Sequence, residues 1–311
     1  MMKDKIKAVV LVGPTASGKT ALSCSLAEKG NMEIVSADSM QIYRGFPIAS
    51  ATPTAEEKGN IPHHLFEFLE PNEPFSVADY VTLATATCEE IVLRGKTPLI
   101  VGGTGLYVDS LLKGISFEEE AGSEEVRSAL KAEADRLGGE AMLEQLRKID
   151  PLAAEKLHPH DEKRILRGLE VYRLHGITPT EMNQKALEKG SRFEATLLGI
   201  TYRDRERLYD RINRRVDLMV EHGLLEEAGA MRGTLGATAT QAIGHKELYP
   251  YFDGERSLEE SVEALKQATR RYAKRQLTWF RRNEEIHWIY ADETPDVLAE
   301  AERILKEEEI L

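Results

Sequence analysis

A short segment near the start of the sequence has the residue types and the spacing of a phosphate-binding loop. Gly13 is followed, after four residues, by Gly18, Lys19 and Thr20. Glycines let the backbone fold around an anion, a lysine supplies a positive charge, and the threonine hydroxyl is placed to bind Mg²⁺. The apolar run Ile6–Val12 predicts a strand before the loop, and a helix is expected after it, with its positive end towards the anion. The residues predicted to hold a diphosphate are Gly13, Pro14, Thr15, Ala16, Ser17, Gly18, Lys19 and Thr20.

A carboxylate stands where the next strand is expected to end. Asp38 follows closely on a second strand, which is expected at residues 32–35. Ligands of open parallel sheets bind outside the carboxyl ends of the strands, so Asp38 should face the same crevice as Lys19. There it could accept a proton from a nucleophile. The alternative is a turn or cap residue whose carboxylate bonds local N–H groups.

A third short strand is expected at residues 98–101, and it ends in Gly102-Gly103-Thr104-Gly105. An ATPase or GTPase would normally carry an aspartate on such a later strand to help hold Mg²⁺. The glycines here permit close approach of a ligand, and Thr104 offers a hydroxyl beside it. An ordinary tight turn between strand and helix would have the same sequence.

The pattern of elements predicts an α/β fold with a P-loop NTPase-like parallel sheet and an inserted all-helical domain. Strands and helices alternate over residues 1–116, with a capping box at Ser76 and Asp79 that opens a helix. Residues 117–194 contain helix-favouring stretches and no convincing strand. Residues 195–311 return to the core with a strand at 195–201, long helices at 203–222 and from Ser257, and a last helix capped by Thr294-Pro295.

The composition is that of a globular protein outside the membrane. Of 311 residues, 41% are hydrophobic, and no apolar run approaches the roughly 18–20 residues of a membrane-spanning helix. We expect no signal peptide, and Cys24 and Cys88 lack metal-ligand spacing, which favours the cytoplasm. The net charge of −12 argues against a nucleic-acid partner, yet residues 270–282 contain six Lys/Arg and no acid. The total charge therefore does not decide the partner.

Four segments in this order resemble the bacterial tRNA dimethylallyltransferases. They are residues 13–20, 36–45, 101–107 and 273–280. The similarity extends over essentially the whole chain, including the helical insert. Many unrelated enzymes share the first segment alone, whereas the second and third segments are far more specific.

The resemblance implies transfer of a dimethylallyl group from dimethylallyl diphosphate to N6 of the adenosine immediately 3′ of a tRNA anticodon. The 13–20 segment and Mg²⁺ would hold the diphosphate as charge develops on it. The adenine amine is a weak nucleophile, so a base that takes up its proton is useful. Asp38 stands at the position of this base in the family. Thr104 matches a position near the reacting centre, and Arg215 one that helps to hold the diphosphate.

The resemblance also implies how tRNA is held. An adenine in a stacked loop must be flipped out to react. Arg164 and Arg167 lie one helical turn apart and could meet phosphates, although arginines paired with Asp161 or Glu170 would show the same spacing. Residues 241–246 match a family loop near the anticodon. The last two residues, His245-Lys246, differ from the aromatic–arginine pair that ends this loop in some members of the family. The implied tRNA-binding residues are Asp38, Ser39, Met40, Gln41, Thr104, Arg127, Lys163, Arg164, Arg167, Gln241 and Lys246.

Three other functions fit part of the sequence. An adenylate isopentenyltransferase would use the same core on free nucleotide, but the helical insert of about 75 residues is more suited to a macromolecule. A P-loop small-molecule kinase would bind ATP at Lys19 and activate a hydroxyl with Asp38. A non-catalytic RNA-binding protein would not need Asp38 opposite the loop. We expect a monomer.

Overall fold

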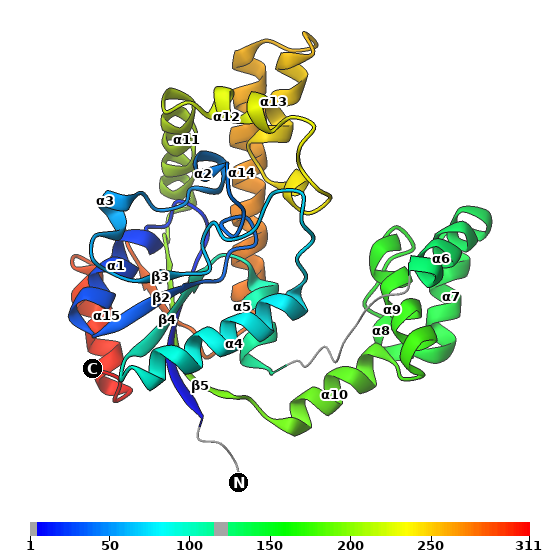
Figure 1. Cartoon of the computed structure of the whole chain (residues 1–311), viewed down its shortest axis with the longest axis horizontal. Helices are drawn as coiled ribbons and strands as arrows, with labels where there is room; N and C mark the ends of the chain where they lie inside the picture. The colour runs from blue at the N-terminus through cyan, green and yellow to red at the C-terminus, as the bar shows by residue number, and fades with distance from the viewer. Residues whose placement is uncertain (1–4, 115–123) are drawn as a thin grey trace. The chain divides into compact units, whose positions relative to one another are not determined.

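The computed structural model describes residues 5–114 and 124–311 and divides the chain into two compact units (Figure 1). The first unit combines Met1–Leu112 with Arg192–Leu311, and the second is Lys113–Ser191. Each unit has a hydrophobic core of its own. The predicted start of the helical insert, residue 117, lies outside the described residues.

A six-stranded sheet with the strand order β3-β2-β4-β1-β5-β6 forms the centre of the first unit. Every neighbouring pair is parallel, which confirms the predicted parallel α/β sheet. The edge strand β3 is only two residues long and is not apparent in the sequence pattern. The strands are β1 (Ile6–Val12), β2 (Met32–Ser36), β3 (His63–His64), β4 (Thr97–Gly102), β5 (Phe193–Thr201) and β6 (His287–Tyr290).

Helices cover both faces of this sheet, and further helices stand beyond its carboxyl edge (Figure 1). Before the second unit the chain forms α1 (Lys19–Lys29), α2 (Pro47–Ser50), α3 (Ala55–Lys58), α4 (Val77–Leu93) and α5 (Gly105–Leu112). After it the chain forms α11 (Arg205–Glu221), α12 (Leu224–Met231), η1 (Ala239–Gln241), α13 (His245–Phe252), α14 (Leu258–Phe280) and α15 (Val297–Glu307).

The central strand β1 shows why both faces must be covered. Its side chains alternate between two cores, as the period of a strand requires. Val10 and Val12 pack with residues of α4 and α5, whereas Val9 and Leu11 pack with residues of α1 and α15. All four side chains are fully buried. From Ala8 to Val12 the strand is the continuous apolar run expected for a parallel strand with helices on both sides.

The predicted capping box at Ser76 and the predicted helix start at Ser257 are confirmed, whereas the predicted start of the last helix is wrong. Ser76 with Asp79 opens α4, and Ser257 with Glu260 opens α14. The helix α15 is capped by Asp296, whose side chain accepts from the backbone N–H of Ala299. Thr294 instead closes the turn after β6, because its N–H donates to the carbonyl of Tyr290 at 2.9 Å.

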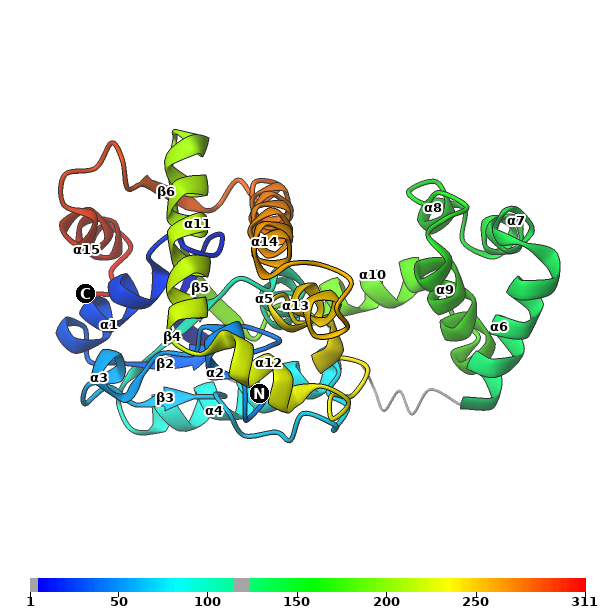
Figure 2. The ribbon, with the colours of Figure 1, turned by 90° about the horizontal axis from the view of Figure 1, so that it is seen from above.

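The second unit is entirely helical among its described residues, and Figure 2 shows α6 to α9 gathered together. Its core includes the buried residues Leu130, Leu146 and Ile165. Asp150 links α8 to α10, because its carboxylate accepts from the N–H and the hydroxyl of Thr180 at 2.9 and 2.7 Å. The helices are α6 (Glu124–Leu137), α7 (Gly139–Ile149), α8 (Pro151–Ala154), α9 (Glu162–His175) and α10 (Pro179–Lys189).

A buried carboxylate ties the edge of the sheet together. Glu33 of β2 is 3% exposed and accepts hydrogen bonds from His64 and Arg94 at 2.7 and 2.6 Å, with the Lys96 ammonium 3.1 Å away. Burial alone would raise the pKa of Glu33, but the bonds from Arg94, His64 and Lys96 lower it to about 2. At pH values above the ordinary pKa of a glutamate, the ionised Glu33 therefore stabilises the folded protein. This stabilisation is lost as the pH falls from about 5 towards 2.

We expect Glu33→Gln to lower the free energy of unfolding by about 2 kcal/mol at pH 7, because three donors lose their ionised acceptor. Urea denaturation at pH 7 and pH 4 measures this change and its dependence on pH. The difference between variant and wild type should shrink at pH 4. Glu28→Gln, on the exposed face of α1, is the matched control and should leave the unfolding curve unchanged. An unaltered curve for Glu33→Gln would contradict the prediction.

Candidate active site

The loop of residues 13–20, called the 13–20 loop below, connects the carboxyl end of β1 to the amino end of α1. The cap residue Gly18 has a left-handed conformation, with φ of 102°, and no side chain caps the helix. The first N–H groups of α1 therefore have no partner within the helix, and they carry its positive dipole end. The hydroxyl of Ser17 is buried in the same loop, and no hydrogen-bond partner for it is found in residues 5–114 and 124–311. The loop thus presents unpaired polar groups suited to an anion.

Two cations and one carboxylate meet at this loop. The Lys19 ammonium donates to the carbonyls of Gly13 and Pro14 at 2.9 and 2.8 Å. Burial and, to a smaller extent, the positive charge of Arg215 lower the pKa of Lys19 to about 7, against the opposing effect of the Asp38 charge. Burial likewise lowers the pKa of Arg215, which lies on α11, while Asp38 again acts in the opposite direction. The structure therefore brings together Lys19, Arg215 and Asp38, and the sequence analysis expected each of the three at the site of the diphosphate.

Asp38 and Thr104 lie at the carboxyl ends of the neighbouring strands β2 and β4, and we call this region the Asp38–Thr104 corner. The Asp38 carboxylate accepts from the N–H of Met40 at 2.9 Å, so it has a local turn partner as well. The Thr104 hydroxyl accepts from the N–H of Ser39 at 3.0 Å and lies 3.3 Å from the Ser39 hydroxyl. A Cβ at Gly102 would lie 2.1 Å from the carbonyl oxygen of Ala37, so a glycine is needed for this close approach.

The sequence reasoning missed two α14 residues that contact these loops. The buried amide of Gln276 accepts from the N–H of Thr15 at 2.9 Å and donates to the carbonyl of Gly103 at 3.0 Å. The Tyr272 hydroxyl lies against the side chains of Thr104 and Gln276. Residues 273–280 carry part of the family resemblance, and residues 270–282 are rich in Lys and Arg. Neither feature distinguishes the neutral amide of Gln276 from its neighbours.

The comparisons with known proteins agree over nearly the whole chain. A family model described as IPP transferase matches residues 41–283, and one described as isopentenyl transferase matches residues 6–62. A protein of Geobacillus kaustophilus named tRNA dimethylallyltransferase is 47% identical over 300 residues, which are 96% of this chain and 95% of that protein. The chain belongs to the tRNA dimethylallyltransferase family. The family resemblance predicted from the sequence is thereby confirmed.

Solved structures of the tRNA dimethylallyltransferase family have the same fold. A full-length tRNA isopentenylpyrophosphate transferase from Bacillus halodurans aligns with a TM-score of 0.70 and 41% identity over 98% of both chains. A eukaryotic dimethylallyltransferase, described as acting on tRNA, aligns with a TM-score of 0.82 and 29% identity. That alignment covers 97% of this chain and 79% of the eukaryotic one.

The candidate RNA-binding cations of the second unit fall into two groups. Arg127 and Arg167 both donate to the carboxylate of Glu170, at 2.5 and 2.8 Å. Burial alone would raise the pKa of Glu170, but the bonds from these two arginines lower it. Lys163 and Arg164 are exposed, and no acidic partner is found for either among the described residues. Lys163 and Arg164, unlike Arg167, are therefore cations of α9 for which the described residues provide no ion pair.

The remaining candidates lie in the first unit. Gln41 is held within the protein, because its amide donates to the carbonyl of Ala51 at 3.1 Å and accepts from the Ser36 hydroxyl at 3.1 Å. Gln241 and Lys246 are exposed, and the Lys246 ammonium donates to the carbonyl of Gln241 at 3.3 Å. His245, which was grouped with them, is fully buried and bonded to Glu227 at 2.9 Å. His245 therefore belongs to the core.

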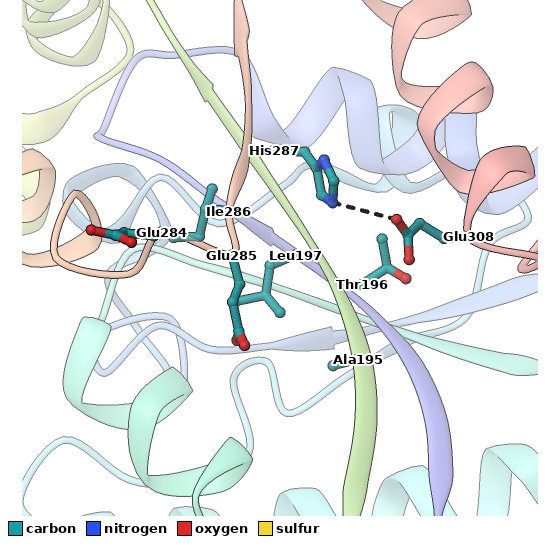
Figure 3. Close-up of a pocket in the computed structure, with 8 residues that line it drawn as sticks. All are labelled: Ala195, Thr196, Leu197, Glu284, Glu285, Ile286, His287 and Glu308. Atoms are coloured by element: carbon teal, nitrogen blue, oxygen red, sulfur yellow. Dashed lines mark ion pairs between the residues drawn. The ribbon is translucent and has the colours of Figure 1, made fainter.

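A hollow elsewhere on the first unit does not coincide with these residues. It has a volume of about 400 Å³ and lies between β5 and the start of β6, and its lining includes Glu284, Glu285 and Glu308 (Figure 3). None of the residues that line it belongs to the 13–20 loop or to the Asp38–Thr104 corner. In the described parts of the chain, no group of three or more His, Cys, Asp or Glu side chains is arranged to hold a metal ion. No helix over those parts is long and apolar enough to span a membrane.

Proposed function

We propose that this chain transfers a dimethylallyl group from dimethylallyl diphosphate to N6 of the adenosine 3′ of a tRNA anticodon. The observation that carries the proposal is the meeting of an uncapped helix end, two cations and one carboxylate at the 13–20 loop. This arrangement suits a diphosphate leaving group with a proton acceptor beside it. The proposed acceptor, tRNA, agrees with the name of the relative from Geobacillus kaustophilus, tRNA dimethylallyltransferase. One solved relative is also described as acting on tRNA.

The diphosphate would bind at the 13–20 loop. Lys19 and Arg215 would neutralise its charge, and the first N–H groups of α1 would donate to its oxygens. Thr20 is part-exposed, no partner for its hydroxyl is found among the described residues, and Mg²⁺ commonly binds phosphates with few protein ligands. We therefore propose that Thr20 contributes a ligand to Mg²⁺, which would supply further positive charge to the leaving group.

The chemical step would proceed with the residues of the Asp38–Thr104 corner. The C–O bond of the donor breaks with its electron pair on the diphosphate, and the electron pair of N6 forms the new C–N bond to the allylic carbon. The proton lost from N6 passes to the Asp38 carboxylate, acting as general base. Thr104 would contact the reacting groups, and the turn of Ser39, Met40 and Gln41 would receive the flipped adenine.

The second unit would hold the stem of the tRNA. Lys163 and Arg164 are free to meet phosphates, and the partly exposed Arg127 and Arg167 would add charge beside Glu170. Gln241 and Lys246 would contact RNA from the first unit. Because the proposed acceptor is tRNA, we place the reaction in the cytoplasm.

We expect Arg164→Ala to weaken tRNA binding by about three- to tenfold and to lower the slope of log Kd against log salt by about one, because one phosphate contact is lost. The turnover number at saturating tRNA should not change. Filter binding at several salt concentrations measures both effects. Arg147→Ala is the matched control, since Arg147 is exposed on the same unit but paired with Glu144. Equal salt slopes for Arg164→Ala and wild type would remove Arg164 from the proposed interface.

The acceptor separates the proposal from its nearest alternatives. Dimethylallyl diphosphate labelled in its carbon chain should label a tRNA transcript with adenosine 3′ of the anticodon and should not label AMP. Labelling of AMP alone would indicate an adenylate isopentenyltransferase. Phosphate transfer from ATP without any prenylation would indicate a kinase. A transcript with guanosine at that position is the matched control and should remain unlabelled.

A further inference from the structure

One buried amide joins two loops that are far apart in the sequence. Gln276 is 5% exposed and lies about one turn before Phe280, the last residue of α14. Its side-chain oxygen accepts from the N–H of Thr15, 261 residues away, and its side-chain nitrogen donates to the carbonyl of Gly103, 173 residues away. The two distances are 2.9 and 3.0 Å. Both bonds are therefore of ordinary length and join the 13–20 loop to the turn after β4.

The chemistry of both partners requires an amide at this position. Thr15 offers an N–H donor and Gly103 a carbonyl acceptor, so the side chain between them must accept at one atom and donate at another. An ionised glutamate cannot donate, and methionine of similar length can form neither bond well. The site is also closely packed, since a Cβ at Gly103 would lie 2.1 Å from the Gln276 nitrogen.

The connection continues from Gly103 into the Asp38–Thr104 corner. Thr104 follows directly in the chain, its N–H donates to the carbonyl of Ala37 at 3.2 Å, and its hydroxyl accepts from the N–H of Ser39. The two residues that bracket Asp38 are thus fixed to Thr104. Hydrogen bonds and the peptide link from Gly103 to Thr104 thus connect the 13–20 loop through Gln276 to the backbone on both sides of Asp38.

We propose that Gln276 is a positioning residue that sets the separation between the leaving diphosphate and the base. The proposal rests on the proposed function, in which the 13–20 loop holds the donor and the Asp38–Thr104 corner holds the acceptor. Gln276 acts through backbone groups of Thr15 and Gly103. Replacement of the Gln276 amide should leave the groups that bind each substrate in place. It should, however, allow the 13–20 loop and the turn after β4 to move relative to each other. A displacement of about 1 Å between reacting groups can cost about 100-fold in rate.

The test is Gln276→Met, studied in single turnovers with enzyme in excess and both substrates saturating. We expect the rate constant of prenyl transfer to fall by about 100-fold, with the full amplitude retained. The Kd values for dimethylallyl diphosphate and for tRNA should stay within about threefold of the wild-type values. A fall in the folded fraction would lower the binding stoichiometry and leave the rate constant of the folded molecules unchanged, so the two effects are distinguishable.

Gln267→Met is the matched control, because Gln267 is an exposed residue of the same helix. It should have wild-type rate and binding constants. The inference is overturned if Gln276→Met reacts within about threefold of the wild-type rate, or if weaker binding of one substrate accounts for the whole loss. Absence of tRNA prenylation by the wild-type chain would instead be a failure of the proposed function.

Discussion

Replacement of Asp38 by asparagine is expected to lower the turnover number for tRNA prenylation by about 1,000-fold. Removal of a positioned general base typically costs between about 100- and 10,000-fold, and the adenine amine is a poor nucleophile that depends on such a base. The Asp38 carboxylate also accepts from the N–H of Met40, and an asparagine oxygen can accept the same bond. The variant should therefore keep the turn and the tRNA affinity while it loses the ability to take up the proton.

Steady-state kinetics with saturating tRNA and donor, together with tRNA binding, measure this prediction. Asp210→Asn is the matched control, because it makes the same chemical change at an exposed position of α11, the helix that carries Arg215. It should leave the turnover number within about twofold of wild type. If Asp38→Asn retains more than a tenth of the wild-type turnover, Asp38 is not the base.

Replacement of Lys19 by methionine should weaken the binding of dimethylallyl diphosphate by about 100-fold at pH 7. A charged hydrogen bond to a phosphate contributes about 1.5–3 kcal/mol, and Lys19 lies inside the 13–20 loop. Its pKa of about 7 in the free protein gives a second, more specific expectation. A bound diphosphate raises the pKa of the lysine, so binding above pH 7 must add a proton.

The sign of the pH dependence follows from this proton uptake. Below about pH 7 the free lysine is already charged, whereas above it the donor affinity should fall by up to tenfold for each pH unit. Calorimetric titrations between pH 7.5 and 9, at constant Mg²⁺, measure the affinity and the protons taken up. The affinity of Lys19→Met should not show this fall, and Lys29→Met, at the exposed end of the same helix, should behave like wild type. A wild-type affinity that is constant over this pH range would contradict the prediction.

Local sequence signals were sufficient for much of the fold. The bounds of β1 follow from an apolar run that ends at glycine and proline, and α4 and α14 begin where a serine and an acid form a capping box. Short elements were not predictable in this way. The helix α13 contains Pro250, which normally marks a helix end, and it is stabilised by the buried residues His245 and Leu248. Tertiary packing decides such elements.

The candidate site was predictable only where chain order places residues at strand ends. Lys19, Asp38 and Thr104 each follow a buried strand, so parallel topology alone predicts that they share one edge of the sheet. Gln276 lies within a helix, and nothing in its local pattern indicates partners that are more than 170 residues away. The pairing of Arg127 with Glu170 likewise depends on how α6 and α9 pack, whereas Arg167 lies three residues before Glu170 on α9 and its pairing was an alternative visible in the sequence.

The central claim is that the 13–20 loop holds a leaving group while carbon is transferred. The most direct measurement uses dimethylallyl diphosphate labelled both in its carbon chain and in its terminal phosphate, with tRNA as acceptor. The account predicts one intact diphosphate released for each dimethylallyl group that appears on N6 of the adenosine next to the anticodon. It is contradicted if phosphate label enters the acceptor, or if the carbon label never reaches tRNA.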